Sequence, residues 1–354
     1  MSCALVWFSV PISSFGPQRP QFLNFSAASR RSCRVSLRAM RGDPGKAKQI
    51  AYQAAALAAA LGLAWFLIAN TAANLQARHI ATGFGFLARP AGFEVGESFF
   101  LRYGASDTYL RALGVGLVNT LAVSAIGIVL ATALGTLVGV LRLFGNAVLK
   151  ALGAAYVEFI RNSPLLVQLF FWYALITESL PAPREALHPL PGVFLTNRGV
   201  FFPGFSGAPV LEGFNFVGGV VLSPEFAALL AGLVVYTAAF IAEIVRAGVL
   251  AVRRGQWEAG QAVGLSRAQT LRHVVLPQAL RVIVPPMTSQ YLDLVKNSSL
   301  AVAIGYPDLV SIANTSINQT GQAIEGIAVI MGVYLTISLA ISALMNWYNA
   351  RVAR

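Results

Sequence analysis

Six mostly apolar stretches of 17 to 29 residues recur along the chain and are separated by more polar segments. A membrane-spanning α-helix needs about 20 consecutive apolar residues. The pattern therefore predicts an all-α polytopic membrane protein with about six transmembrane helices, in a range of five to eight. The predicted spans are residues 50–70, 113–141, 164–180, 224–245, 282–304 and 324–347.

The segments between these spans divide the chain into three regions. Residues 1–45 form an N-terminal tail, residues 46–110 hold the first span and a loop, and residues 111–350 hold the remaining spans. We expect residues 142–163 to be a short basic connection. The loop 181–222 is long and rich in Pro, Gly and Phe, and two apolar triplets around Thr196-Asn197-Arg198-Gly199 predict a β-hairpin within it.

Small residues recur at every fourth position of the second span, at Gly127, Ala131, Gly135 and Gly139. Such a ladder allows another helix to approach closely. A contact with another subunit and packing within this chain both remain open from the sequence.

A basic amphipathic segment separates the fourth and fifth spans. Residues 257–263 have the pattern of a short helix, which Gly264 can end in the left-handed conformation. Ser266 can cap a second helix, with Gln269 completing a capping box, and Pro277 either ends that helix or begins the next. A helix pair that is apolar on one face and charged around it, between two spans, is a docking element for another protein.

Composition supports the membrane assignment and excludes one alternative. Apolar residues make up 56% of the chain and charged residues 11%, the mean hydropathy is +0.66, and soluble domains carry about 25% charged residues. The net charge is +12, but the basic residues are not gathered into a patch with interleaved aromatic residues, so nucleic-acid binding is not expected.

The basic residues instead indicate the orientation of the chain. With the N-terminus inside, 19 of the 26 Lys and Arg residues lie in inner segments, six lie in outer loops, and Lys296 lies within a span. Cytoplasmic loops carry such an excess. We therefore expect the loop 181–222 to face outward, and the segment 247–281 and the C-terminus to face the cytoplasm.

The first 42 residues contain six arginines and no acidic residue. This composition is typical of a transit peptide, although a translation start at Met40 is also consistent with the sequence. Cys3 and Cys33 both lie in this tail, so the predicted spans hold no disulfide framework or cysteine metal site.

No enzymatic motif is present in the sequence. Residues 42–46 have the wrong glycine spacing for a nucleotide-binding loop and are not followed by Ser or Thr. The histidines at 79, 188 and 273 are far apart in loops. We expect no catalytic activity, no cofactor and no metal, so any ATP hydrolysis must come from a partner.

The fifth span is unusually polar. Its polar residues include Ser289, Asp293, Lys296, Asn297, Ser298 and Ser299. At 100° per residue, Ser289, Asp293 and Lys296 fall within an arc of about 60°. Ionisable residues at membrane depth face the protein interior or a water-filled path. A substrate path is one interpretation, and an Asp293–Lys296 pair that only braces the bundle is the other.

The segment between the fourth and fifth spans carries a long spaced motif. Glu258-Ala259-Gly260, Gly264 and Leu276-Pro277 resemble the "EAA" coupling loop of ABC-transporter membrane subunits. Gly260 replaces the third alanine, which we expect to weaken the first helix by about 1 kcal/mol, and Val274 replaces an isoleucine. A solvated loop of another kind of membrane protein is the alternative.

Further stretches resemble the polar amino-acid uptake family of ABC permeases. They are Gly116–Leu121, Tyr156–Arg161, Ser163–Gln168, Ala242–Arg246 and Lys296–Leu300. The loop sequence Leu195–Gly199 is similar to one in the general L-amino-acid transporter permeases.

This resemblance implies a permease subunit of an ATP-driven importer in the bacterial inner membrane, carrying L-amino acids. It implies four partners: an ABC ATPase, a second permease subunit that is either identical or different, an extracytoplasmic amino-acid-binding protein, and the lipid bilayer. The implied ATPase-coupling residues are Glu258, Ala259, Gly260, Gly264, Leu276 and Pro277. A permease for another small polar solute, an ion-gradient-driven secondary transporter and a structural membrane protein are the alternatives.

Overall fold

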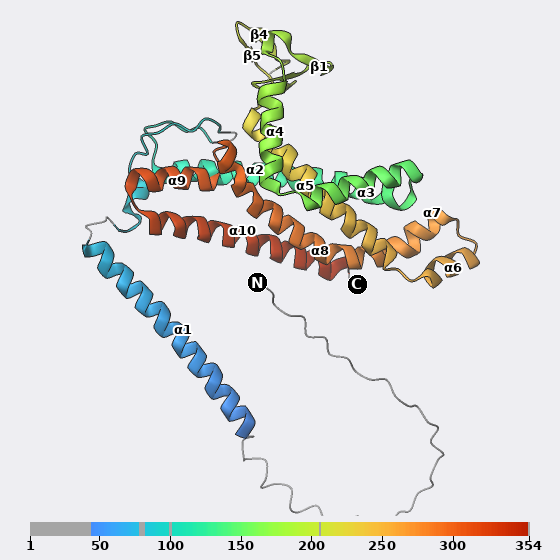
Figure 1. The fold of residues 1–354 in the computed structure, drawn as a ribbon, viewed down its shortest axis with the longest axis horizontal. Coiled ribbons are helices and arrows are strands. Elements are labelled where there is room, and N and C mark those ends of the chain that lie inside the picture. The colour runs from blue at the N-terminus through green and yellow to red at the C-terminus, as the bar shows by residue number, and fades with distance from the viewer. Residues whose placement is uncertain (1–43, 78–81, 99–100, 205–206, 353–354) are drawn as a thin grey trace, which may run out of the picture. The chain divides into compact units, whose positions relative to one another are not determined.

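The computed structural model describes residues 44–77, 82–98, 101–204 and 207–352, and the helices dominate it (Figure 1). Both predictions for the N-terminal tail lie outside these residues. The α-helices are α1 Pro44–Ala77, α2 Tyr109–Phe144, α3 Ala147–Asn162, α4 Leu165–Ser179, α5 Pro224–Leu250, α6 Arg254–Ala262, α7 Arg267–Thr270, α8 Leu276–Asn297, α9 Leu309–Thr320 and α10 Ala323–Val352. Short 3-10 or π segments are η1 Phe84–Ala88, η2 Pro183–Glu185, η3 Leu271–Val275 and η4 Ser298–Ile304.

The contacts divide the chain into two units, Met1–Asn74 and Leu75–Arg354. Helix α1 belongs almost entirely to the first unit, and its residues 51–77 are long and apolar enough to cross a membrane. They contain no charged residue. The other helices belong to the second unit.

Six spans are present if bent helix pairs are counted as one span each. Four described helices are long and apolar enough to cross a membrane singly: α1, α2, α5 and α10. Helices α3 and α4 form one bent pair, with an angle of 108°, and the run Arg267–Ile304 forms the other with α9, at 53°. The prediction of a helical polytopic protein with about six spans is confirmed.

The predicted short connection at 142–163 is wrong. Helix α2 continues to Phe144, and all but a few of the remaining residues form helix α3. Asn146 caps α3 by accepting the Leu149 N–H at 2.9 Å, and Pro164 follows the helix. Because the residue before a proline is biased away from the helical conformation, the chain bends sharply between α3 and α4.

The small-residue ladder of α2 packs within this chain, against α5. A Cβ atom on Gly135 would lie 2.6 Å from Ile241 Cβ and 2.7 Å from the Ala238 carbonyl oxygen. Gly139 is similarly close to Ala242. The ladder therefore lets the backbones of α2 and α5 approach closely. Of the two alternatives, contact with another subunit and packing within this chain, the structure shows the second.

The long loop forms two small antiparallel sheets. Strands β1 Leu187–Leu190, β2 Val193–Thr196, β3 Gly199–Phe202 and β6 Val220–Leu222 pair in the order β1-β2-β3-β6, and β4 Val210–Glu212 pairs with β5 Asn215–Val217. The predicted hairpin is β2–β3, with Thr196 opposite Gly199. Phe194, Phe201 and Phe216 pack together as its core. These strands add a β element to the predicted all-α fold.

The segment before α2 is tied to the start of α5. Ser223 caps α5 by accepting the Phe226 N–H at 3.0 Å, and its hydroxyl donates to Glu97 Oε2 at 2.6 Å. Burial raises the pKa of the Glu97 carboxyl, and the Ser223 hydrogen bond opposes this shift. The Asn119 side chain also donates to the Glu97 carbonyl, which fixes this segment over α2.

Candidate functional site

Helices α6 and α7 form the predicted helix pair. Gly264 ends α6 with a φ of 87°. The Gly264 N–H donates to the Gln261 carbonyl, and the Leu265 N–H to the Gly260 carbonyl, which is a Schellman motif. Ser266 and Gln269 form the predicted capping box at 2.9 and 3.3 Å. The first helix, which the sequence predicts to begin at residue 257, begins three residues earlier, at Arg254.

The second helix of the pair does not end at Pro277. Residues 267–297 run as one helical stretch through α7, η3 and α8, and the junction residues Thr270, Leu271, Val275 and Leu276 all have right-handed helical angles. Pro277 lies within this stretch, shortly after the π segment η3, and its missing N–H leaves the His273 carbonyl without its usual helical donor. The second short helix and the fifth span are therefore one continuous helical rod.

Gly260 is a packing position between the two short helices. The residue is buried, and a Cβ atom there would lie 2.5 Å from Thr270 Cγ2 and 2.9 Å from Thr270 Oγ1. Thr270 is itself fully buried. The glycine therefore allows α6 to approach α7 closely, which offsets the helix propensity that it lacks.

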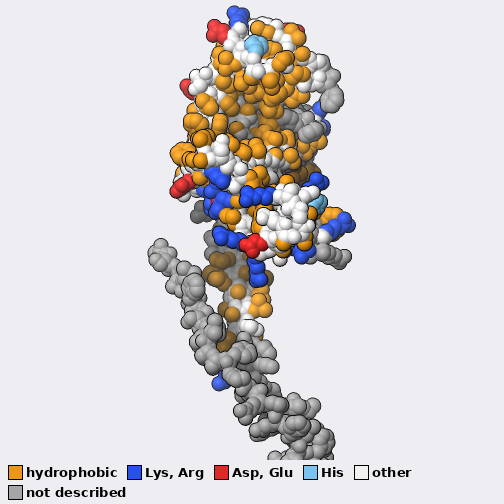
Figure 2. Space-filling model, turned by 90° about the vertical axis from the view of Figure 1, so that its right-hand side faces the viewer, with side chains coloured by type: hydrophobic (Ala, Val, Ile, Leu, Met, Phe, Trp, Pro, Cys, Tyr) orange, Lys and Arg blue, Asp and Glu red, His pale blue; other side chains and the backbone are white. Residues whose placement is uncertain are grey.

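The outer surface of α6 and α7 is open. Glu258, Ala259, Leu276 and Pro277 are all exposed. Figure 2 looks onto this end of the molecule, where Lys and Arg side chains surround the short helices below a largely apolar surface. A groove of about 500 Å³ runs between the end of α2 and the short helices, lined by Phe144, Trp257, Gln261, Arg267, Ala268 and Leu271.

Helix α8 presents an exposed polar stripe. Ser289, Asp293 and Lys296 are all exposed and lie on one face, as the helical period predicts. Pro285 and Pro286 lie inside the same helix. Because proline lacks an N–H, the carbonyls four residues earlier, at Arg281 and Val282, lose their helical donors, and both of these residues are also exposed.

The structure separates the other polar residues of the fifth span from this stripe. Ser298 is fully buried, and its hydroxyl donates to the Val295 carbonyl at 2.8 Å. The Ser299 hydroxyl donates to the Lys296 carbonyl at 2.7 Å, and Asn297 is half-buried. Among the described residues, neither Asp293 nor Lys296 belongs to an ion pair.

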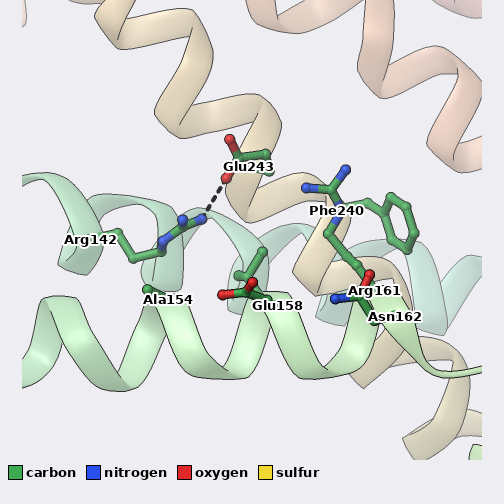
Figure 3. Close-up of a pocket in the computed structure, with 8 residues that line it drawn as sticks. Arg142, Ala154, Glu158, Arg161, Asn162, Phe240 and Glu243 are labelled. Atoms are coloured by element: carbon green, nitrogen blue, oxygen red, sulfur yellow. Dashed lines mark hydrogen bonds and ion pairs between the residues drawn. The ribbon is translucent and has the colours of Figure 1, made fainter.

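A charged pocket of about 430 Å³ lies between α2, α3 and α5 (Figure 3). Arg142 reaches from α2 to Glu243 on α5 at 2.6 Å, and Arg246 binds the same carboxylate at 2.5 Å. From α3, Glu158 and Arg161 line the pocket, and the Arg161 guanidinium lies 5.0 Å from the centre of the Phe240 ring.

Two charged residues of opposite sign in this pocket are unpaired. Neither Glu158 nor Arg161 belongs to an ion pair within the described part of the chain, whereas Arg142 and Arg246 share the Glu243 carboxylate and leave one net positive charge there. A small zwitterion could therefore be bound there through both of its charges. Sequence reasoning gave these residues no role, although charged residues inside apolar helices were a signal that could have found them.

Comparison with known proteins agrees with this architecture. Residues 127–354 match the family described as "Binding-protein-dependent transport system inner membrane component". The chain is 45% identical to the "Putative amino-acid ABC transporter permease protein YhdX" of Escherichia coli K12, over 85% of this chain and 93% of that protein. It is 40% identical to the "General L-amino acid transport system permease protein AapQ" of Rhizobium johnstonii, over 90% and 95%.

A solved structure shares the fold. The crystal structure of an amino acid ABC transporter with histidines aligns with a TM-score of 0.52 and 25% identity, covering 69% of this chain and 95% of that one. The chain therefore belongs to the binding-protein-dependent transport system inner membrane component family and is a membrane-spanning permease of the ABC transporter class.

Proposed function

We propose that this chain is one of two permease subunits in an ATP-driven importer of L-amino acids, working in a bacterial inner membrane with an ABC ATPase and an extracytoplasmic binding protein. One observation carries the substrate class. Two relatives that are 40% and 45% identical over most of the chain are named as amino-acid permeases.

The direct test is transport by the reconstituted complex. The chain is assembled with its partner subunits in liposomes, and uptake of a panel of amino acids and other small polar solutes is measured with and without ATP. ATP-dependent uptake of amino acids supports the proposal. Uptake that follows an ion gradient without ATP would identify a secondary transporter, and selective uptake of another solute would overturn the substrate class.

The ATPase docks, in this proposal, on the exposed surface of α6 and α7. Glu258 is the acidic residue of this surface, and the remaining coupling residues shape it: Ala259, Gly260, Gly264, Leu276 and Pro277. Glu258→Lys reverses a charge on an exposed side chain, so the permease should still fold. We expect uptake to be lost and the ATPase to dissociate more readily during purification.

A matched control is Glu212→Lys, which makes the same change at an exposed residue of strand β4. Uptake should be retained in that variant. Normal uptake and normal ATPase retention in Glu258→Lys would exclude this residue from the coupling contact.

The substrate path, in this proposal, follows the α8 stripe and is closed by the second permease subunit. A charged stripe on a membrane helix requires water or protein opposite it, because lipid would leave Asp293 and Lys296 unsolvated. The two free carbonyls made by Pro285 and Pro286 have the same requirement. Lys296 then meets the carboxylate of the amino acid and Asp293 its ammonium group, with Ser289, Asn297 and Ser299 as the other proposed path residues. Ser298 is fully buried away from the stripe and is left out of the proposed path.

Removing both charges distinguishes a path from a structural pair. The double variant Asp293→Leu, Lys296→Met should assemble and hydrolyse ATP but lose amino-acid uptake. Lys150→Met, at an exposed lysine of α3, is the control for loss of one positive charge. Uptake near the parent level in the double variant would rule out a direct role for the α8 stripe.

A further inference from the structure

A second polar cluster lies inside the bundle, where α2, η4, α9 and α10 meet. Its members are Thr120 on α2, Ser298 at the start of η4, Asp308 just before α9 and Tyr334 on α10. Thr120, Ser298 and Asp308 are each 0% exposed, and the Tyr334 hydroxyl is buried as well. The amino-acid path proposed above does not use this cluster.

Asp308 brings a carboxylate into the cluster without a basic partner. Its Oδ1 atom caps α9 by accepting the Ser311 N–H at 2.8 Å, whereas Oδ2 has no hydrogen-bond partner. The ion pairs formed within the described residues join Arg111 with Asp107, and Arg142 and Arg246 with Glu243. A buried carboxylate is normally paired with a positive charge or bound to a metal ion.

The hydroxyl groups around Asp308 have free oxygen lone pairs. The Tyr334 hydroxyl is close enough to interact with Asp308, Ser298 and Thr120, yet it forms no hydrogen bond of ordinary geometry. Ser298 directs its proton to the Val295 carbonyl, and Thr120 accepts the Leu309 N–H at 3.1 Å. Four oxygen atoms from four separate elements therefore converge, and two of them are unpartnered.

We propose that this cluster binds one small monovalent cation, sodium or potassium. Carboxylate and hydroxyl oxygens are the ligands that hard cations prefer, and a single carboxylate matches a single positive charge. Within the described residues no group of three His, Cys, Asp or Glu side chains is close enough to hold a metal ion, so this cluster is poorly suited to divalent and transition metals. A bound water molecule could join the same oxygens but would leave the carboxylate charge uncompensated.

The ion would hold α9 and α10 against α2. Helix α10 is otherwise weakly buried, since none of its residues from 327 to 351 is buried. A cation at Asp308 and Tyr334 adds a link between this helix and the core, and a ligand that binds only the folded state stabilises it by mass action. The expected consequence is cation-dependent thermal stability of the permease.

The test uses the full chain, assembled with its partner subunits in lipid nanodiscs. Thermal unfolding is followed by tryptophan fluorescence in N-methyl-D-glucamine chloride, and sodium or potassium chloride is then substituted at constant ionic strength. We expect a saturable rise of about 2–4 °C in the unfolding temperature, the shift that modest ligand stabilisation produces in a domain of this size. A response to one of the two ions identifies which is bound.

Two variants and a control make the result specific. Asp308→Asn keeps a side chain that caps helices well but removes the charge, so the cation response should disappear, and Tyr334→Phe should shift the titration to higher cation concentration. Asp107→Asn, at the partly exposed partner of Arg111, should respond like the parent. An unfolding temperature that is independent of cation identity, or an unchanged response in Asp308→Asn, would overturn the proposal.

Discussion

Gly260 and Thr270 offer a quantitative test of how α6 and α7 pack. In Gly260→Ala the new Cβ atom would lie 2.5 Å from Thr270 Cγ2, which is too close for real atoms. Alanine favours the helix by about 1 kcal/mol, but overpacking of this kind costs about 1–3 kcal/mol. We expect the single variant to be less stable than the parent, although alanine is the residue that the motif favours at this position.

Thr270→Ala should rescue the substitution. It removes Cγ2 and Oγ1, so the nearest Thr270 atom left to the new Cβ is Cβ, at 3.2 Å. By itself this change loses one buried methyl group, about 0.8 kcal/mol, and also removes a buried hydroxyl that has no hydrogen-bond partner. The two effects partly cancel, so Thr270→Ala alone should be nearly neutral.

A double-mutant cycle measures the coupling directly. Urea unfolding of the helix pair is followed by the fluorescence of Trp257, which packs against the neighbouring core. The double variant should be at least as stable as the parent, with a coupling of about 1–2 kcal/mol between the two sites. Additive effects, or a Gly260→Ala variant that is more stable alone, would refute the close approach of the helices.

Three further outcomes can be measured. Gly135→Ala should separate α2 from α5 and lower stability by about 1–3 kcal/mol, whereas Gly332→Ala, with open space around it, should be neutral or stabilising by urea unfolding. Because the pKa of Glu97 is raised in the folded state, its contribution to folding stability is present below the ordinary carboxyl pKa and is lost as the pH rises through the raised pKa. Glu97→Gln should flatten this part of a profile of unfolding temperature against pH. An unchanged profile would contradict the raised pKa of Glu97. In a variant without native cysteines, a cysteine at the exposed Phe214 should react with an impermeant label in intact cells and one at Ser266 only after permeabilisation; the reverse result would contradict the topology.

Local signals predicted the elements that depend on neighbouring residues. The capping box at Ser266, the left-handed Gly264 and the β2–β3 hairpin all follow from short sequence patterns, and the structure contains each of them. The common face of Ser289, Asp293 and Lys296 follows from helical geometry alone. Ser298 lies about 200° round the helix from Lys296, so its burial also agrees with the period, although its polarity had grouped it with the proposed path.

Features that depend on distant contacts were not predicted. The pair between Arg142 and Glu243 joins residues 101 positions apart. Pro164 causes the sharp bend between α3 and α4, but a proline is equally suited to the first turn of a helix. The sequence therefore does not identify α3 as a separate helix. The sequence alone indicates only a weak helix position at Gly260, because Thr270, which lies against it, is ten residues further along the chain.

The continuous rod from α7 into α8 fixes a rotational phase between the proposed docking surface and the proposed substrate path. About 44 Å of helix separates Arg267 from Lys296 at 1.5 Å per residue, and no loop interrupts it. Inserting one residue between them would turn Lys296 by 100° relative to α6 and move the charged stripe toward the core. Inserting the same residue at the tip of the β4–β5 hairpin would alter only a surface turn, so we expect this permease to tolerate a length change there but not between the proposed docking surface and the proposed path.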